Sequence, residues 1–133
     1  MEVIIRPDAE AACRLAAQLL ARQVRERPDS VLGLATGRTM EMLYRQLAVI
    51  HRDQNLDFSL VRTFNLDEYI GLPANHPGSY RSYMHRQLFS RINIDPRNTF
   101  LPDGTAKDLK AECAAYEARI RRAGGIDLQL LGI

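Results

Sequence analysis

In the segment Thr63-Phe64-Asn65-Leu66-Asp67-Glu68-Tyr69-Ile70-Gly71-Leu72, an expected strand is followed at once by two carboxylates. Residues 58–64 are rich in β-branched and aromatic side chains, which is typical of a strand. Gly71 and Pro73 then predict a turn, because glycine allows positive φ and proline cannot continue a ladder. A strand of an open α/β sheet that ends in an acid delivers that acid to the ligand-binding crevice. We therefore expect the two acids at such a crevice, although a solvated turn is the plainer interpretation of a lone Asp-Glu pair.

The rest of the chain alternates between expected strands and helices. We expect strands at residues 3–5, 31–34, 58–64, 99–101 and 126–131, and helices at about 8–27, 40–51, 77–91 and 105–123. Such alternation predicts a parallel sheet, and right-handed crossovers bring the carboxyl ends of its strands to one edge. We therefore predict a Rossmann-like, three-layer α/β fold, with a parallel sheet that is covered by helices and incomplete at the C-terminal side. Residues 1–133 would form a single α/β domain.

Helix caps and buried faces follow from the same pattern. Asp8 is expected to cap the first helix, residues 105–108 to form a capping box for the last one, and Gly124-Gly125 to end it. Pro77 fits the first turn of the third helix. The apolar spacing predicts four buried faces: Ala12, Leu15, Ala16, Leu19 and Gln23; Leu43, Tyr44, Leu47 and Ile50; Tyr80, Tyr83, Met84 and Leu88; and Leu109, Cys113, Tyr116 and Ile120.

Composition excludes several classes of protein. The 133 residues are 46% hydrophobic and 26% charged, which is ordinary for a globular protein. A formal net charge of +2 with scattered basic residues does not indicate a nucleic-acid partner. Cys13 and Cys113 lie in helical patterns without a Cys-x-x-Cys spacing, which favours a reducing cytosol. Because neither a signal peptide nor a membrane-spanning run is evident, we expect a cytoplasmic protein that binds no nucleic acid and no membrane.

A second loop, Gly33-Leu34-Ala35-Thr36-Gly37-Arg38-Thr39, lies between an expected strand and an expected helix. Backbone N–H groups at a helix N-terminus favour phosphate, and the threonine and arginine side chains add polar groups. The loop is not a Walker A sequence, because its glycine spacing is one residue short, and it is not the dinucleotide-binding Gly-x-Gly-x-x-Gly pattern. By itself it is equally consistent with phosphate binding and with an ordinary turn and helix cap.

The histidines form no recognisable catalytic or metal-binding pattern. His51 lies near a helix C-terminus, where its position is electrostatically favourable. His76 lies in a polar loop, and His85 is in the middle of a helix. No spacing of His, Cys and Asp indicates a metal site, and no Ser or Cys lies in a nucleophile elbow. We therefore expect neither a metal nor a cofactor.

Four segments together carry a resemblance to the glucosamine-6-phosphate deaminase family: Leu32–Thr39, Thr63–Leu72, His76–Tyr80 and Tyr83–Arg86. The Asp-Glu-Tyr sequence at residues 67–69 differs from the Asp-Glu-Arg that is usual in the related 6-phosphogluconolactonases. The resemblance implies that glucosamine 6-phosphate and water are converted to fructose 6-phosphate and ammonia by an aldose–ketose isomerisation.

The resemblance also implies which residues act. Asp67 matches the general base, which moves a proton between C2 and C1 of the sugar, with Glu68 and Tyr69 as supporting neighbours. Thr36, Gly37, Arg38 and Thr39 match the loop that holds the phosphate of the substrate, a phosphorylated amino sugar. We expect Glu68 to matter less than Asp67, because neighbouring residues of a strand point to opposite faces. A homo-oligomer is expected.

Two departures from the family limit what the resemblance implies. Arg38 stands where the family usually has a second glycine, so that its side chain could strengthen phosphate binding or obstruct it. The Gly-His-Ile-x-Phe-Asn-Glu sequence, which supplies the ring-opening histidine, is absent from these 133 residues. The chain thus resembles the N-terminal portion, and we expect it to lack deaminase activity alone and to self-associate. The alternatives are a non-catalytic phosphosugar-binding or regulatory module, a structural remnant, and a 6-phosphogluconolactonase-like enzyme.

Overall fold

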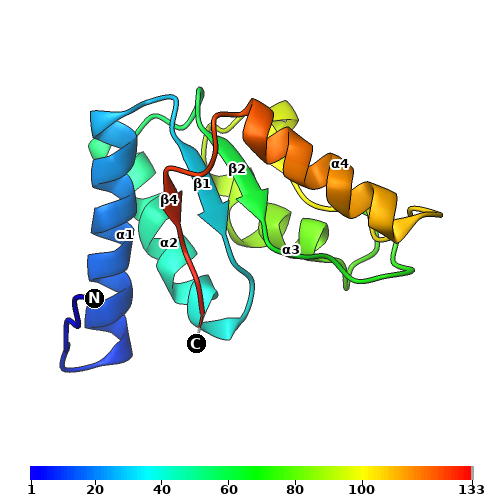
Figure 1. Ribbon diagram of the computed structural model, residues 1–133. Coiled ribbons are helices and arrows are strands. Elements are labelled where there is room, and N and C mark those ends of the chain that lie inside the picture. Colours follow the sequence, from blue (N-terminus) through cyan, green and yellow to red (C-terminus); the bar gives the residue numbers. More distant parts are fainter. Residues whose placement is uncertain (133) are drawn as a thin grey trace.

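The computed structural model describes residues 1–132 as helices packed on a parallel sheet (Figure 1). The elements in chain order are α1 (Ala9–Glu26), β1 (Val31–Leu34), α2 (Arg38–Gln54), β2 (Arg62–Asn65), α3 (Tyr80–Gln87), the 3₁₀ helices η1 (Phe89–Arg91) and η2 (Pro96–Asn98), β3 (Thr99–Phe100), α4 (Leu109–Arg122) and β4 (Leu128–Gln129). The four strands lie in the order β3-β2-β1-β4, and every pair is parallel. The predicted α/β fold with a parallel sheet is confirmed.

Helices pack on both faces of the sheet. On one face α1, α2 and α3 enclose the larger core, which includes Leu32 and Leu34 of β1. The predicted buried face of α2 is confirmed: Leu43, Tyr44, Leu47 and Ile50 are all buried. On the other face α4 covers a smaller core, in which the Phe64 ring stacks on Phe100 with a centroid distance of 4.7 Å. The Tyr116 ring meets Phe64 edge-on at 5.7 Å.

The buried face of α1 differs from the predicted one. The residues that it buries are Cys13, Ala17, Leu20, Ala21 and Val24. Of the predicted residues, Ala12 and Leu19 are exposed, and the others are only half-buried. Alanine and leucine occur all around this helix, so apolar spacing alone does not select one face. The N-cap is as predicted, because the Asp8 carboxylate accepts a hydrogen bond from the N–H of Ala11 at 2.7 Å.

Three strand predictions need correction. Residues 3–5 form no strand, and their side chains are exposed, because no described strand lies beside them to satisfy their backbone groups. The strand expected at 58–64 begins only at Arg62, because Phe58 and Val61 close a turn through a backbone hydrogen bond of 3.1 Å. The final strand, expected at 126–131, covers only Leu128–Gln129.

The starts of two helices also differ from prediction. α3 begins at Tyr80, after Pro77, because the Ser79 hydroxyl caps it; it ends at Gln87 and gives way to η1. The capping box expected at 105–108 does not form: Asp108 alone caps α4, accepting a hydrogen bond from Ala111 N–H at 2.9 Å.

The C-terminal half of α4 packs on the sheet, and the N-terminal half projects beyond it (Figure 1). Tyr116 and Ile120 of the predicted face are therefore covered, whereas Leu109 and Cys113 are exposed. The helix ends before Gly124 and Gly125, as predicted, and both glycines have positive φ.

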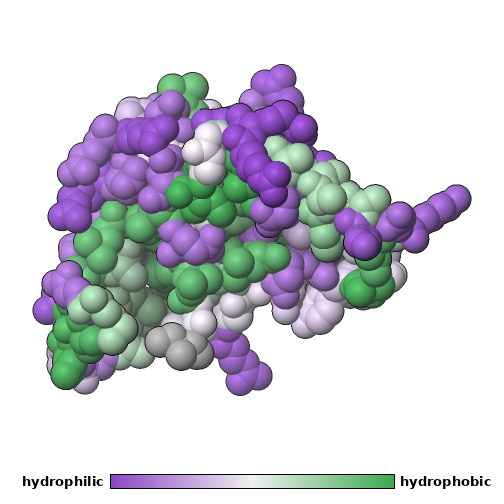
Figure 2. All heavy atoms as spheres, viewed as in Figure 1, coloured by the Kyte–Doolittle hydropathy of each residue, from purple (hydrophilic) through white to green (hydrophobic). Residues whose placement is uncertain are grey.

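The sheet is covered unevenly on the α4 face. α4 lies over β2 and β3, whereas apolar side chains reach the surface in the middle of this face, near β4 (Figure 2). Ile126, Leu128 and Leu130 are half-buried, and Leu131 is exposed. Both faces of a parallel sheet are ordinarily covered. The structure therefore agrees with the prediction of a sheet that is incomplete at its C-terminal side.

Candidate active site

Two loops lie side by side at the carboxyl edge of the sheet. Leu34, the last residue of β1, pairs in register with Asn65, the last residue of β2. The chain segments that follow, residues 35–39 and 66–69, therefore leave the sheet at the same level. These are the two segments in which the sequence predicted site residues, and the structure brings them together at one edge.

The first loop leads into α2 through Gly37. This residue is the N-cap of α2, with φ 119° and ψ 165°, a conformation that is essentially confined to glycine. No side chain caps the helix there, and the space where a Cβ would lie is open. Gly37, Arg38 and Thr39 are exposed, and Thr36 is half-buried. Free N–H groups at an open helix N-terminus are suited to an anion such as phosphate.

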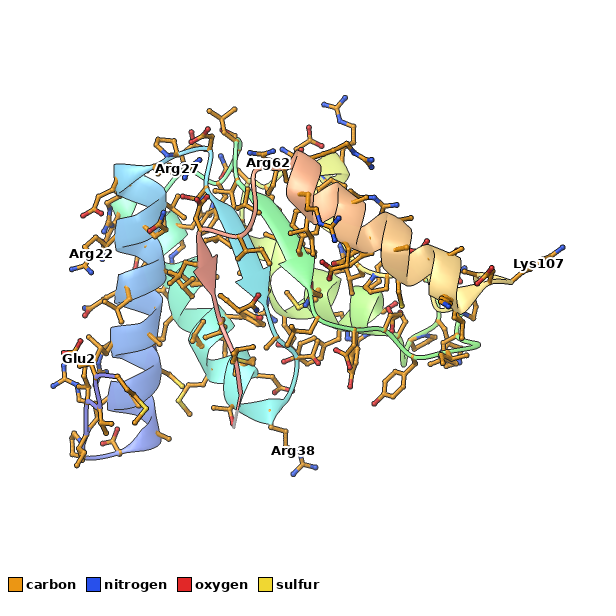
Figure 3. The ribbon with its side chains drawn as sticks, viewed as in Figure 1. Glu2, Arg22, Arg27, Arg38, Arg62 and Lys107 are labelled. Atoms are coloured by element: carbon orange, nitrogen blue, oxygen red, sulfur yellow. The ribbon has the colours of Figure 1, made fainter. Side chains whose placement is uncertain are left out.

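Arg38 projects outward from the start of α2 (Figure 3). Its guanidinium forms no hydrogen bond or ion pair with any residue in the described range 1–132. In this position the side chain leaves the backbone of Gly37 open, and its charge remains free for an approaching anion.

Tyrosine hydroxyls fix the carbonyl groups of the first loop. Tyr44 of α2 donates a hydrogen bond to the carbonyl of Ala35, and Tyr83 of α3 donates one to the carbonyl of Gly37 at 2.7 Å. Burial raises the pKa of Tyr44, and burial together with the nearby Glu41 charge raises the pKa of Tyr83 to about 12. The sequence indicated both tyrosines as members of apolar faces, and Tyr83 also as part of a segment that carries the family resemblance, but neither as a partner of the first loop. The signal that was available is that a buried tyrosine hydroxyl needs a partner.

In the second loop, Asp67 lies beyond the end of β2 and is exposed. No hydrogen bond or ion pair from residues 1–132 reaches its carboxylate. The neighbouring Tyr69 and Tyr80 rings lie 4.5 Å apart, and the Tyr80 hydroxyl donates to that of Tyr69 at 3.2 Å. The hydrogen bond to Tyr69 and partial burial raise the pKa of Tyr80; an interaction with Thr36 lowers it, and the Asp67 charge raises it. Asp67, Thr36 and the tyrosine pair thus lie near one another at the carboxyl edge of the sheet.

Glu68 is engaged in quite different contacts. Its carboxylate accepts hydrogen bonds from three backbone N–H groups, those of Tyr69 at 2.9 Å, Tyr80 at 2.8 Å and Arg81 at 3.0 Å. The last two belong to the first turn of α3, where a carboxylate is electrostatically favoured. The strand has ended by this point, so the contacts of Glu68 follow from the helix N-terminus and not from strand alternation.

The sequence placed Asn65 in the stretch at the strand end but indicated no contact for its buried side chain. Its side-chain amide donates to the carbonyl of Leu34 at 3.3 Å, which joins the ends of the two strands. Its Oδ1 has no hydrogen-bond partner among residues 1–132. The Tyr116 hydroxyl of α4 donates to the Asn65 carbonyl at 2.7 Å. The carboxyl edge is therefore held from both faces of the sheet.

The histidines make their contacts away from these two loops. His51 Nδ1 lies 2.7 Å from the carbonyl of Leu56, and His76 Nδ1 accepts a hydrogen bond from Gly78 N–H at 3.0 Å. His85 is exposed on α3. Across residues 1–132 no group of three or more His, Cys, Asp and Glu side chains is arranged to hold a metal ion.

Residues 8–133 match the family described as glucosamine-6-phosphate isomerases/6-phosphogluconolactonase. The chain belongs to this family. It is 52% identical to the glucosamine-6-phosphate deaminase of Cellvibrio japonicus and 51% identical to that of Halothermothrix orenii. Both comparisons cover the whole chain but 51% and 55% of the relatives. The chain thus spans about half the length of the curated relatives it matches.

Solved structures of the family agree with this fold. A monomeric glucosamine-6-phosphate deaminase superposes with a TM-score of 0.98 at 45% identity, covering 100% of this chain and 55% of that one. The 6-phosphogluconolactonase of Thermotoga maritima superposes with a TM-score of 0.76 at 22% identity, over 99% of this chain and 58% of that one. At this lower identity the likeness shows the fold alone. Among the helices in residues 1–132, none combines the length and apolar character needed to cross a membrane.

Proposed function

We propose that this chain supplies the general base and the phosphate-binding loop of a glucosamine-6-phosphate deaminase. The observation that carries the proposal is the meeting of Asp67 with residues 36–39 at one edge of the sheet. Relatives that are about half identical are glucosamine-6-phosphate deaminases, and the 6-phosphogluconolactonase likeness is more distant. The substrate would be glucosamine 6-phosphate, and the products fructose 6-phosphate and ammonia.

In this proposal the open N-terminus of α2 binds the phosphate group. The N–H groups that follow Gly37 and the hydroxyls of Thr36 and Thr39 are donors, and Arg38 adds a positive charge. Holding the phosphate fixes one end of the open-chain sugar and leaves the reacting carbons toward the second loop. Such positioning lets a weak carboxylate base act on a carbon-bound proton.

Asp67 would then transfer the proton. It removes the proton from C2 of the open-chain aldehyde, which gives an enolamine, and returns it to C1, which leaves an imine at C2. Water adds to that imine, and ammonia departs to leave the ketone of fructose 6-phosphate. A carboxylate without competing hydrogen bonds is free for both proton steps. Ring opening is assigned by the resemblance to the Gly-His-Ile sequence, which these 133 residues do not contain.

The proposal is tested by joining residues 1–133 to the remaining C-terminal part of the Cellvibrio japonicus relative, which is 52% identical over the shared region. Fructose 6-phosphate release from glucosamine 6-phosphate is then measured in a coupled assay. We expect turnover from the chimera and none from the chain alone. A folded chimera that binds glucosamine 6-phosphate without turnover would support the alternative of a phosphosugar-binding module.

We also propose that the chain works in the cytoplasm and associates with itself. The two cysteines are free, one buried on α1 and one exposed on α4, which supports a reducing compartment. The apolar residues around β4 support self-association (Figure 2). Sedimentation velocity across a range of concentrations tests the second part, and a monomer at all of them, as in the monomeric relative, would contradict it.

A further inference from the structure

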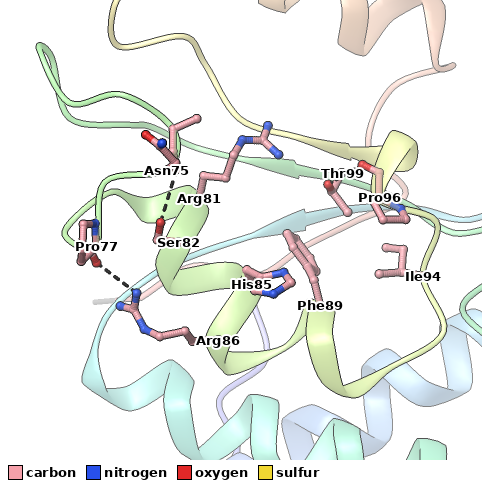
Figure 4. Close-up of a pocket in the computed structure, with 11 residues that line it drawn as sticks. Asn75, Pro77, Arg81, Ser82, His85, Arg86, Phe89, Ile94, Pro96 and Thr99 are labelled. Atoms are coloured by element: carbon pink, nitrogen blue, oxygen red, sulfur yellow. Dashed lines mark hydrogen bonds between the residues drawn. The ribbon is translucent and has the colours of Figure 1, made fainter.

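One face of the helix α3 points away from the candidate active site and lines a cavity. Tyr80 and Tyr83 lie on the side of the crevice. Arg81 and His85 lie on the opposite side, where they line a cavity of about 530 Å³ (Figure 4). No residue of the segments 36–39 and 67–69 lines this cavity. It is therefore a separate site and is independent of the proposed deaminase function.

The charges that line the cavity are all positive. Arg81 and Arg86 contribute guanidinium groups, His85 contributes an imidazole, and no lining residue is acidic. The Arg86 guanidinium already donates one hydrogen bond, to the carbonyl of Pro77 at 3.0 Å. The guanidinium of Arg81 forms no hydrogen bond or ion pair with residues 1–132. A half-buried, unpaired guanidinium in a concave site is a good binding group for an anion.

The nearest acidic side chains already have partners. Glu68 and Asp103 line an adjoining hollow that shares Arg81. Glu68 accepts its three backbone N–H groups, and Asp103 accepts hydrogen bonds from the N–H and hydroxyl of Thr105 at 2.9 and 2.6 Å. Asp95, next to the far wall of the cavity, pairs with Arg97 at 2.6 Å. None of these three carboxylates lines the cavity itself.

The far wall of the cavity is apolar. Ile94 and Pro96 face α3 across the cavity, and the Phe89 ring lies beside His85 at its base (Figure 4). A volume of this size is in the range of small-molecule sites, which combine apolar walls with a few polar groups. The cavity thus matches a ligand with an anionic end and a flat or apolar body.

We propose that this cavity binds a small organic phosphomonoester. The phosphate lies against Arg81 and His85, which are four residues apart and therefore neighbours on one helix face. The organic part packs on Phe89 and Pro96. A guanidinium and an imidazole N–H on one helix face can donate to several oxygens at once, and a phosphate dianion offers more acceptor oxygens and more charge than a carboxylate does.

The experiment is a titration of the 133-residue chain with phenyl phosphate, in which the amide chemical shifts are measured by NMR at each step. We expect shifts in residues 81–89 and 94–99, weaker binding of inorganic phosphate, and no comparable binding of phenol. Equal binding of phenol would overturn the proposal, since it would show an apolar pocket without anion recognition. Shifts confined to residues 36–39 would also overturn it. A parallel titration with glucosamine 6-phosphate reports on residues 36–39, so that failure of this site and failure of the proposed active site are distinguishable.

The variant Arg81→Gln tests the assigned contact. The backbone N–H that binds Glu68 is retained, so the start of α3 is preserved. Phenyl phosphate should bind about 10–100-fold more weakly, the scale of a charge-assisted hydrogen bond. Arg45→Gln, at an exposed position of α2 outside the cavity, is the matched control and should bind as the unchanged chain does. Equilibrium dialysis with phenyl phosphate provides the same comparison if self-association broadens the spectra, and unchanged affinity of Arg81→Gln would overturn the proposal.

Discussion

The loop after β1 and the loop after β2 reach the same edge of the sheet, but they are held there through different groups. In residues 35–39 the tyrosine hydroxyls of Tyr44 and Tyr83 hold carbonyl groups, and the N–H groups of the helix start remain free. In residues 66–72 the Glu68 carboxylate holds N–H groups of α3, and the neighbouring carboxylate of Asp67 remains free. In each loop, one set of polar groups is held by hydrogen bonds, and another set remains free to contact a ligand.

The contrast between the two loops identifies the groups that are available for chemistry. Both loops depend on α3, a helix of eight residues, which receives the Glu68 carboxylate at its start and contacts Gly37 through Tyr83. Groups that are free should affect binding or turnover and leave stability nearly unchanged. Groups that are held should affect stability and, through the position of the loops, binding as well. Four substitutions test this division, and a fifth, Tyr44→Phe, serves as a comparison for the last of them.

Asp67→Asn should have the largest effect. In the chimera with the Cellvibrio japonicus C-terminal part, the loss of the base should lower turnover by about 10²–10⁴-fold, the usual contribution of general base catalysis. Because Asp67 has no partner among the described residues, the urea-unfolding midpoint of the Asp67→Asn variant should hardly differ from that of the unchanged chimera. Asp53→Asn, an exposed acid on α2, is the matched control and should keep full turnover. Near-normal turnover of Asp67→Asn would contradict the assignment of Asp67 as the general base.

Arg38→Ala should have the next largest effect, and it should be on binding alone. If the guanidinium pairs with the phosphate, glucosamine 6-phosphate should bind about 1.5–3 kcal/mol more weakly, as expected for a charge-assisted hydrogen bond. The exposed side chain has no partner to lose, so stability should change by less than about 0.5 kcal/mol. Calorimetric titration of the chimera measures the affinity, with Arg45→Ala as control. Unchanged or tighter binding would mean that Arg38 points away from the phosphate.

The sequence was sufficient to predict the parallel sheet and the position of two polar loops at its carboxyl edge. Val31–Leu34 and the face of α2 carry unambiguous apolar patterns, and Asp67 and Thr36–Thr39 directly follow strands. In the short and irregular elements, prediction failed where tertiary contacts decide. Residues 3–5 are apolar enough for a strand but have no neighbouring strand to pair with in the described fold.

The held groups could not be predicted, because their partners are distant in sequence. The Glu68 carboxylate binds N–H groups 12 and 13 residues later, and the Tyr83 hydroxyl binds a carbonyl 46 residues earlier. No local pattern encodes such pairs. The free groups are recognisable because strand ends and helix starts are local features, whereas the groups that position them depend on how α3 packs.

Glu68→Gln should reduce both stability and activity moderately. An amide offers one acceptor oxygen to the three N–H groups and directs its NH₂ toward one of them, so that at least one hydrogen bond to a charged acceptor is lost. For this half-buried group we expect a loss of about 1–3 kcal/mol in the free energy of unfolding. Urea unfolding measures it, with Glu117→Gln on the exposed side of α4 as control. A loss of activity without any loss of stability would contradict the supporting role.

Tyr83→Phe should have the smallest effect at neutral pH, and the effect should depend on pH. The change removes the hydrogen bond to the Gly37 carbonyl and keeps the ring, so we expect a loss of about 0.5–1.5 kcal/mol in the free energy of unfolding.

Burial raises the pKa of Tyr83 to about 12, above its usual value of 10.0 in an unfolded chain. Between these two values the folded protein keeps a proton that the unfolded chain releases, so the contribution of Tyr83 to stability decreases as pH rises. Urea unfolding at about pH 8 and about pH 11.5 should therefore show the difference between Tyr83→Phe and the unchanged chain diminishing toward the higher pH. Tyr44→Phe, whose ring is fully buried, should lose more stability at neutral pH, because the Ala35 carbonyl would be left unpaired in the core. A constant difference for Tyr83→Phe at both pH values would contradict the raised pKa of Tyr83, and the absence of any difference at about pH 8 would show that this hydroxyl does not stabilise the first loop.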